Sequence, residues 1–300
     1  MARLFLFFIF LQFSSIAFPQ GKQKANHSHT LEKNLIFLSS DSLKGRMPGT
    51  PEADIAADYI SRQFKKLKLK PYTKSGYFQE FTYVTPDSEF VKTRNVIAFL
   101  NRGCEKTIII GAHYDHIGFG GKHSRAPGKK EIHNGADDNA SGVALLLELA
   151  AALRSHKKSN YNYLFIAYSG HEQGLFGSRN FRESILFPGI KTALVLNLDM
   201  VGRLDTVTRS LIVYGNLENK QLGPLAQKAN LKLIYEENLT ERSDLKEFVS
   251  LKIPLLGLST GFHDDYHAPG DDFEKLNVKG IREVQYFILS FLKDFNAEKK

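Results

Sequence analysis

Four short segments of the chain are almost continuously apolar, and they set the expected architecture. Runs that are apolar on both faces are typical of central strands in a parallel sheet. Helix-like sequence separates each run from the next, and this alternation predicts an α/β fold: a three-layer α/β/α sandwich around a mostly parallel, mixed central sheet. The four predicted strands are Ile108–Ala112, Tyr163–Tyr168, Ala193–Leu198 and Pro254–Leu258.

Helical periodicity is clearest in two other segments. Glu52–Lys70 carries an apolar stripe and stops before Pro71, and Ala140–Leu153 carries another, with Asn139 or Ser141 available as its N-cap. Three further segments complete the expected elements: an apolar pattern at Leu31–Leu38 and alternating, strand-like patterns at Tyr77–Val84 and Asn95–Leu100.

The first twenty residues have a different texture. They contain one positive charge and no acid, and their apolar run from Leu4 to Leu11 is shorter than the ~20 residues that a membrane span needs. Ser15 and Ala17 supply small residues for a cut after Ala17. This pattern predicts a signal peptide over residues 1–17, with a retained membrane anchor as the alternative.

The predicted signal peptide has consequences for the expected localisation and for the expected domain limits. No cysteine follows the apolar run, so a lipoprotein anchor has no attachment point. We therefore expect a secreted or periplasmic protein with no stable membrane insertion after cleavage. A polar spacer is expected over residues 18–30 and one domain over residues 31–295, because no internal repeat or Pro/Gly/Ser linker divides the chain.

Composition excludes several classes of function. Cys104 is the only cysteine, so no internal disulfide forms and any metal site must use His, Asp and Glu. The net charge of +8 is spread along the chain, with basic clusters at Arg62–Lys70 and Lys122–Lys130. Neither cluster is interleaved with stacking aromatics, which disfavours a nucleic-acid partner.

Each predicted central strand runs into residues that bind metals. In open α/β sheets, ligands bind beyond the carboxyl ends of the strands. A single Asp or His there is explained by helix capping or packing, but four such strand ends and a helix start bury negative charge that needs a cation. We expect a metal site, most simply of two ions, and thiolate-free ligands suit zinc, cobalt or manganese. The residues are His113, Asp115, His116, Asp137, Asp138, His171, Glu172, Asp199, His263, Asp264, Asp265 and His267.

Five motifs occur in the order and approximate spacing of the di-zinc aminopeptidase family, and the chain resembles that family over most of residues 31–290. They are GAHYDH, GADDNASG, HEQGLFGS, NLDMVG and YHAPGDD, and Gly45–Thr50 resembles the family's N-terminal signature. The family includes secreted bacterial leucyl aminopeptidases and shares its fold with glutaminyl cyclases. The resemblance implies a zinc-dependent peptidase domain over residues 31–295 with two zinc ions. It also implies hydrolysis of the N-terminal bond of peptides with a free N-terminus, through a hydroxide bound to both metals. No obligate protein partner is inferred.

The resemblance also implies roles for single residues. His113 and Asp199 match ligands of one zinc ion, Glu172 and His267 match ligands of the other, and Asp137 matches the bridging carboxylate.

Three neighbouring carboxylates match supporting positions. Asp115 lies two residues from His113, on the same side of an extended strand end, and is expected to orient that histidine. Asp138 is expected to support the helix start, and Asp271 to fix the loop that carries His267.

One position departs from the family pattern. Members commonly carry two glutamates before the Gly-Leu-x-Gly-Ser tail, the first as general base and the second as metal ligand. Aligned on Gly174–Ser178, this chain has Glu172 at the ligand position and His171 at the base position. A neutral histidine can still move a proton, so we expect a hydrolase with His171 as its base. The alternatives are a metal-binding relative with weak or no peptidase activity and a glutaminyl-cyclase-like acyltransferase.

Two loops are further candidates for the rim of a substrate cleft. The Gly-rich stretch Ile117–Gly135 connects the first ligand strand to the acidic pair. Ser243-Asp244 resembles a family segment near the substrate, although Leu245 stands where a histidine is common. Secondary site candidates on or beside the Gly-rich stretch are His116, His123 and His133.

Overall fold

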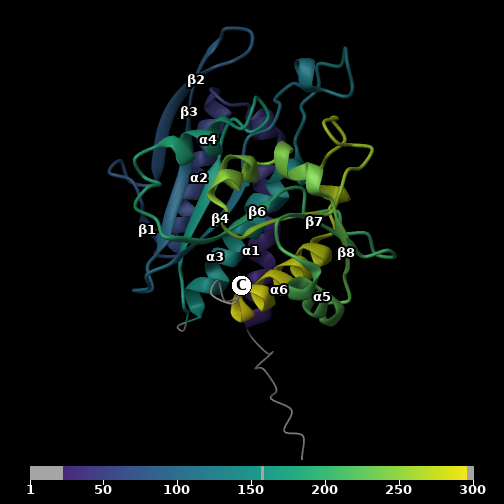
Figure 1. Ribbon diagram of the computed structural model, residues 1–300. Coiled ribbons are helices and arrows are strands. Elements are labelled where there is room, and N and C mark those ends of the chain that lie inside the picture. The colour runs from purple at the N-terminus through teal and green to yellow at the C-terminus, as the bar shows by residue number, and fades with distance from the viewer. Residues whose placement is uncertain (1–22, 157–158, 296–300) are drawn as a thin grey trace, which may run out of the picture.

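The computed structural model describes residues 23–156 and 159–295, and it is a sheet covered on both faces by helices (Figure 1). The strands are β1 (Lys70–Pro71), β2 (Phe78–Val84), β3 (Phe90–Leu100), β4 (Thr107–His113), β5 (Asn162–Tyr168), β6 (Thr192–Leu198), β7 (Ser210–Gly215), β8 (Lys232–Tyr235) and β9 (Leu255–Ser259). The α-helices are α1 (Gln23–Leu38), α2 (Pro51–Lys66), α3 (Gly142–Ser155), α4 (Phe176–Glu183), α5 (Asn219–Lys228) and α6 (Val278–Asp294).

The sheet is parallel in its middle and antiparallel towards its edges. Its order is β1-β3-β5-β4-β6-β9-β7-β8, with β2 paired to β3. The four central strands, β5, β4, β6 and β9, run parallel to one another. β3 pairs with β5 and β7 pairs with β9, both in the antiparallel sense. The four apolar runs are therefore the central strands, as expected, and the predicted fold class is confirmed.

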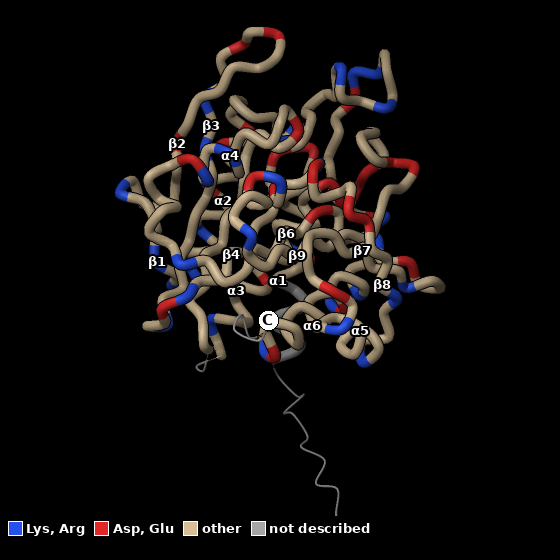
Figure 2. The backbone as a smooth tube through the Cα atoms, viewed as in Figure 1, with Lys and Arg blue, Asp and Glu red and all other residues tan. Residues whose placement is uncertain are grey.

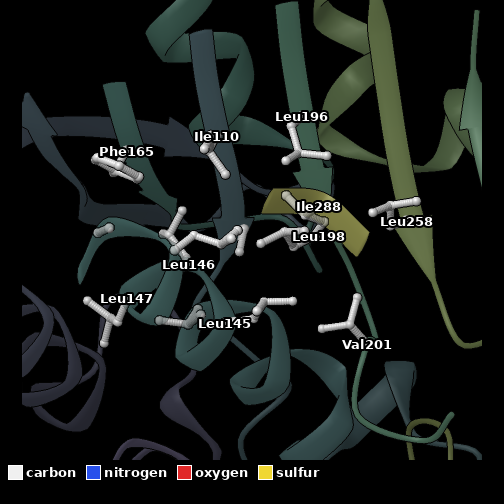
Figure 3. Close-up of a cluster of buried hydrophobic side chains, with 14 of the residues drawn as sticks. Ile110, Leu145, Leu146, Leu147, Phe165, Leu196, Leu198, Val201, Leu258 and Ile288 are labelled. Atoms are coloured by element: carbon white, nitrogen blue, oxygen red, sulfur yellow. The ribbon is translucent and has the colours of Figure 1, made fainter. Parts of the chain in front are cut away.

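Helices cover the two faces unequally. One face packs against α1, α2, α3, α5 and α6, and the other against α4 and the 3-10 helix η5 (Asp244–Leu251). α3 is buried on nearly all sides, so Leu145, Leu146 and Leu147 all meet apolar neighbours (Figure 3). Each such leucine contributes about 1.5–3 kcal/mol through burial, which makes α3 a rigid support for the loop before it.

Two helix boundaries differ from the sequence prediction. α2 ends at Lys66 rather than Lys70, because Lys68 adopts a left-handed conformation and the N–H of Leu69 bonds to the Phe64 carbonyl in a Schellman closure. The freed residues Lys70–Pro71 pair with β3 at one edge of the sheet. α3 begins at Gly142, since residues 136–141 form a wider π-helical turn, η3.

The N-terminal predictions are only partly covered by the structure. The predicted signal peptide lies outside the described residues, whereas residues 23–30 of the predicted spacer already belong to α1. In the described part, no helix combines the length and apolarity needed to cross a membrane. The bounds of the predicted domain stay a prediction.

Candidate metal centre

The carboxyl ends of the parallel strands bring seven potential ligands together. β4 ends at His113, β6 leads directly into Asp199, and the loops after β5 and β9 carry Glu172 and His267. Acidic positions gather in the loops at this end of the sheet, opposite the C-terminus (Figure 2). Two groups have ligand atoms within 4.8 Å of one another: His116, Asp138, Glu172 and His267, and separately His113, His171 and Asp199.

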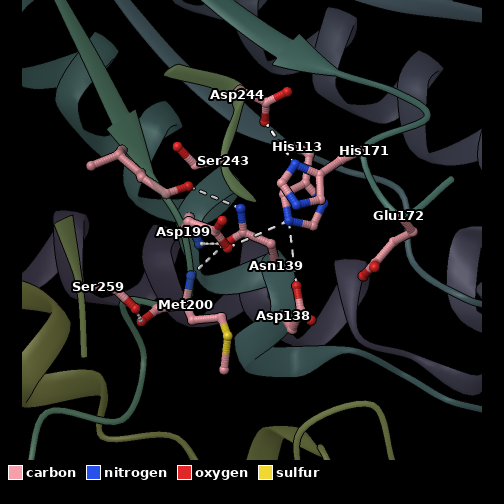
Figure 4. A network of polar contacts seen from close by, with 12 residues as sticks. His113, Asp138, Asn139, His171, Glu172, Asp199, Met200, Ser243, Asp244 and Ser259 are labelled. Atoms are coloured by element: carbon pink, nitrogen blue, oxygen red, sulfur yellow. Dashed lines mark hydrogen bonds and ion pairs between the residues drawn. The ribbon is translucent and has the colours of Figure 1, made fainter. Parts of the chain in front are cut away.

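Asp138 joins the two groups. Its Oδ1 lies 3.3 Å from Nε2 of His113, and its Oδ2 lies 3.2 Å from Nε2 of His267. Figure 4 shows this carboxylate below the His113 ring. Asp199 Oδ1 approaches the same His113 nitrogen at 3.5 Å, and Glu172 Oε2 approaches the His267 nitrogen at 3.1 Å. A single carboxylate therefore reaches towards both groups.

The structure corrects the expectation for Asp137. Its Oδ1 accepts hydrogen bonds from Gly202 N and Ser141 Oγ, and its Oδ2 faces His263 Nε2 at 3.3 Å. Asp138 has an extended backbone (φ −104°, ψ 89°) inside the η3 turn, so the two consecutive side chains diverge. Asp138, and not Asp137, therefore lies between the two groups.

The ring nitrogens of His113 and His267 that face the carboxylates are placed to bind a metal rather than to form hydrogen bonds. Nε2 of both His113 and His267 is buried and has no hydrogen-bond partner among the described residues, although carboxylate oxygens lie 3.1–3.5 Å away. Their Nδ1 atoms are engaged elsewhere, with the backbone carbonyls of Asp115 (3.1 Å) and His123 (2.9 Å). This leaves each Nε2 lone pair free to bind a metal.

Electrostatics point the same way. Burial alone lowers the pKa of His267, but the carboxylates of Asp138 and Glu172 outweigh it and raise that pKa to about 10. The pKa of Glu172 is held below its ordinary value: burial and Asp138 raise it, but His116 and His267 lower it further. The buried carboxylates thus demand positive charge, which protonated histidines supply in the metal-free chain and zinc can supply in their place.

Asp115 acts differently from the expectation. Its backbone carbonyl, rather than its carboxylate, accepts the His113 Nδ1 hydrogen bond, and the nearest carboxylate oxygen lies 3.8 Å from that nitrogen. The fully buried carboxylate instead accepts the backbone N–H groups of His171 and Glu172, each at 3.2 Å. Asp115 therefore fixes the loop that presents both residues.

His171 lies against the centre rather than inside it. Its ring stacks on His113 with centroids 3.8 Å apart and planes 8° apart. An imidazole lone pair lies in the ring plane, so two parallel rings at this spacing do not both direct lone pairs at one ion. Nδ1 of His171 is 3.0 Å from Oδ2 of buried Asp244 (Figure 4). Burial and His113 lower the pKa of His171, but Asp244 outweighs them and raises it to about 9.

Sequence reasoning underrated several residues around the centre. His116, a secondary candidate, places Nδ1 2.9 Å from Glu172 Oε1. Asp271 holds the backbone N–H groups of Asp137 and Asp138 at 3.0 Å, so it positions the acidic turn.

Two other predicted histidines, His123 and His133, lie outside the two groups, and a buried arginine, Arg46, supports the backbone nearby. His133 bonds to Ser124 and His123 offers only its carbonyl to His267, so neither belongs to the two groups. Arg46 is fully buried and donates to the carbonyls of Leu38, Tyr114, Asn134 and Gly135. Its position in the N-terminal signature carried no hint of this role.

Comparisons with known proteins identify the family of the chain. The model for "Peptidase family M28" matches residues 95–292. The alkaline phosphatase isozyme conversion protein of Escherichia coli is 32% identical over 161 residues, covering 52% of this chain and 46% of that protein. A probable leucine aminopeptidase of Arthroderma otae is 28% identical over 219 residues, covering 71% and 51%. The chain thus spans about half the length of these curated relatives.

The fold has counterparts among solved structures. A leucine aminopeptidase precursor from Bacteroides thetaiotaomicron superimposes with a TM-score of 0.73 at 18% identity, covering 91% of this chain and 97% of that one. At this identity the likeness concerns the fold alone.

Proposed function

This chain belongs to peptidase family M28 and is a zinc-dependent hydrolase, and on that premise we propose that it is an exported aminopeptidase with two zinc ions. It would remove the N-terminal residue from peptides. The observation that carries the proposal is the position of Asp138, whose two oxygens face His113 on one side and His267 on the other. The sequence pattern of residues 1–17 supports export.

The proposed ligand set follows from the contacts. His113 and Asp199 hold one ion, Glu172 and His267 hold the other, and Asp138 bridges them. Bound zinc supplies Lewis acidity, which activates water and polarises the scissile carbonyl.

His171 supplies the proton transfer. The pKa of about 9 belongs to the metal-free chain, and the positive charge of zinc bound beside His171 would lower it, so that the ring is neutral in the loaded enzyme. Its Nδ1–H donates to Asp244, which leaves Nε2 as the nitrogen that accepts a proton from the attacking water and passes it to the leaving amino group. His171 also lines the cleft beside Asp138 and Asp199, where a substrate would lie. Asp115 supports this role because it holds the backbone of His171 and Glu172.

The test measures zinc content and turnover of chromogenic aminoacyl substrates on the same samples. The zinc-loaded protein is expected to release N-terminal residues. His171→Ala is expected to keep its zinc and to lose about 10²–10⁴-fold in kcat, because the proton acceptor is gone. Exposed His156, at the far end of α3, is the matched control, and His156→Ala should change neither quantity.

Two results would contradict the proposal. A fully zinc-loaded wild type that hydrolyses no aminoacyl substrate would be the metal-binding relative that the His171 position also allows. Conversion of an N-terminal glutamine peptide to a cyclic product, without hydrolysis of other substrates, would instead identify an acyltransferase.

A further inference from the structure

A cleft opens beside the proposed zinc site of His113 and Asp199, and one charge in its lining has no part in the proposed chemistry. The lining includes Asp199 and His171 as well as apolar Met200 and Leu239. The unused charge is the guanidinium of Arg242, at the end of the 3-10 helix η4 (Glu237–Arg242).

An aromatic row connects Arg242 to the metal centre. Its Cζ lies 5.4 Å from the centroid of the Phe262 ring. Phe262 meets Tyr266 edge to face at 4.8 Å, and Tyr266 stacks on the ligand His267 at 4.0 Å. Phe262 and Tyr266 both line the cleft, so the row holds the exposed guanidinium of Arg242 at its rim.

Arg242 has no anionic partner among the residues that the structure describes. The adjacent carboxylate of Glu241 lies 3.7 Å from Lys246. The carboxylates in the lining of the cleft are those of Asp138 and Asp199, both assigned to zinc. With zinc bound, Arg242 is therefore the fixed charge left for a substrate to meet.

We propose that Arg242 selects peptides whose N-terminal residue is acidic, by pairing with the side-chain carboxylate of Asp or Glu. A guanidinium offers a planar pair of donors that matches a carboxylate. The apolar lining accommodates the methylene groups that lead to it. This inference rests on the proposed aminopeptidase function, because it assumes that the cleft receives the N-terminal residue.

The test compares the binding of free L-glutamate and L-glutamine to the zinc-loaded full chain by calorimetry. The two have nearly the same shape and differ in one negative charge, so the ratio of their dissociation constants isolates the charge. We expect glutamate to bind about tenfold more tightly, as one charge-assisted contact at a partly exposed site provides. Arg242→Gln should bring the ratio close to one.

Arg125 provides the matched control, since its guanidinium lies 4.7 Å from the Tyr266 ring centroid but does not line the cleft. Arg125→Gln should keep the preference for glutamate. A ratio near one in the wild type, binding of neither amino acid, or a preference that survives Arg242→Gln overturns the inference. Because binding is measured without turnover, a protein that prefers glutamate and hydrolyses nothing would refute the aminopeptidase but not the acidic pocket.

The same carboxylate chemistry exists at the C-terminus of a short peptide. A second arm therefore compares the KM values for hydrolysis of Leu-Gly and of Leu-Gly amide in the wild type and in Arg242→Gln. If Arg242 discriminates this pair and not glutamate from glutamine, the side-chain assignment is wrong. If it discriminates only glutamate from glutamine, the assignment stands.

Discussion

Nδ1 of His171 lies 3.0 Å from Oδ2 of Asp244, and the Asp244 side chain is almost completely buried. The contact joins the loop after β5 to the start of η5, which are 73 residues apart in the chain. A carboxylate that holds one ring nitrogen selects the tautomer whose other nitrogen can accept a proton. Asp244 is therefore a positioning residue for the proposed base.

Asp244→Asn is expected to lower kcat by about 10²-fold or more, since the amide can present either donor or acceptor to Nδ1 and no longer selects the tautomer. KM should change little, because Asp244 itself does not line the cleft. Combining Asp244→Asn with His171→Ala should cost no more than His171→Ala alone, because the two residues act as one unit. Losses that multiply in the double variant would show that Asp244 acts independently of His171.

Substitutions in the acidic turn should distinguish the roles of Asp137 and Asp138. Asp138→Asn is expected to lose most bound zinc, because it removes the charge shared by both proposed ions. Asp137→Asn should keep zinc and lose stability instead, since its carboxylate holds Gly202 N and Ser141 Oγ. Zinc content by mass spectrometry and Tm on the same samples test this. Zinc loss in Asp137→Asn with full loading in Asp138→Asn would restore the assignment made from sequence.

The strands that carry the site could be predicted because their environment is simple. β4, β5, β6 and β9 are buried on both faces, so nearly every position is apolar and the run is visible in the sequence. The edge strand β1 is only two residues long and both are exposed, which leaves no periodicity to recognise. α2 ends early because Lys68 has a left-handed backbone conformation, and a lysine in the sequence does not predict that conformation.

The site was harder to predict than the strands, for physical reasons. Strand ends identified His113, Glu172, Asp199 and His267, because parallel strands deliver their carboxyl ends to one edge. The choice between Asp137 and Asp138 depends on backbone angles inside a single π-helical turn, where consecutive side chains point apart. The partner of His171 comes from a segment 73 residues away, and such a pairing is visible only in three dimensions.

Arg46 should be essential for folding. Its buried guanidinium donates to four backbone carbonyls, at the end of α1, just after β4 and just before the acidic turn. Within the described part of the chain, Arg46→Leu removes these donors, leaves only the Gly135 carbonyl with another partner, the N–H of Ala140, and is expected to lower the free energy of unfolding by about 3 kcal/mol or more. Exposed Arg62 on α2 is the control, and Arg62→Leu should stay within about 0.5 kcal/mol of wild type in urea denaturation. Equal stabilities of the two variants would contradict this role.

Stability should depend on pH in opposite ways with and without zinc. Burial lowers the pKa of His267, but Asp138 and Glu172 raise it to about 10 in the metal-free fold, against about 6.5 in an unfolded chain. A raised pKa stabilises the fold fully below about pH 6.5, and this contribution is lost as the pH rises towards 10. Zinc binds the neutral imidazole, so its affinity increases over the same window.

The Tm difference between zinc-loaded and chelated protein should therefore widen from pH 6.5 to pH 8.5. His171, whose pKa Asp244 raises to about 9 against the effect of burial, adds to the loss in the chelated protein. His267→Gln should reduce the widening, because it removes both the titrating group and a zinc ligand. Two Tm curves that stay parallel across this range would mean that zinc does not replace the protons of these histidines, and the proposed ligand set would fail.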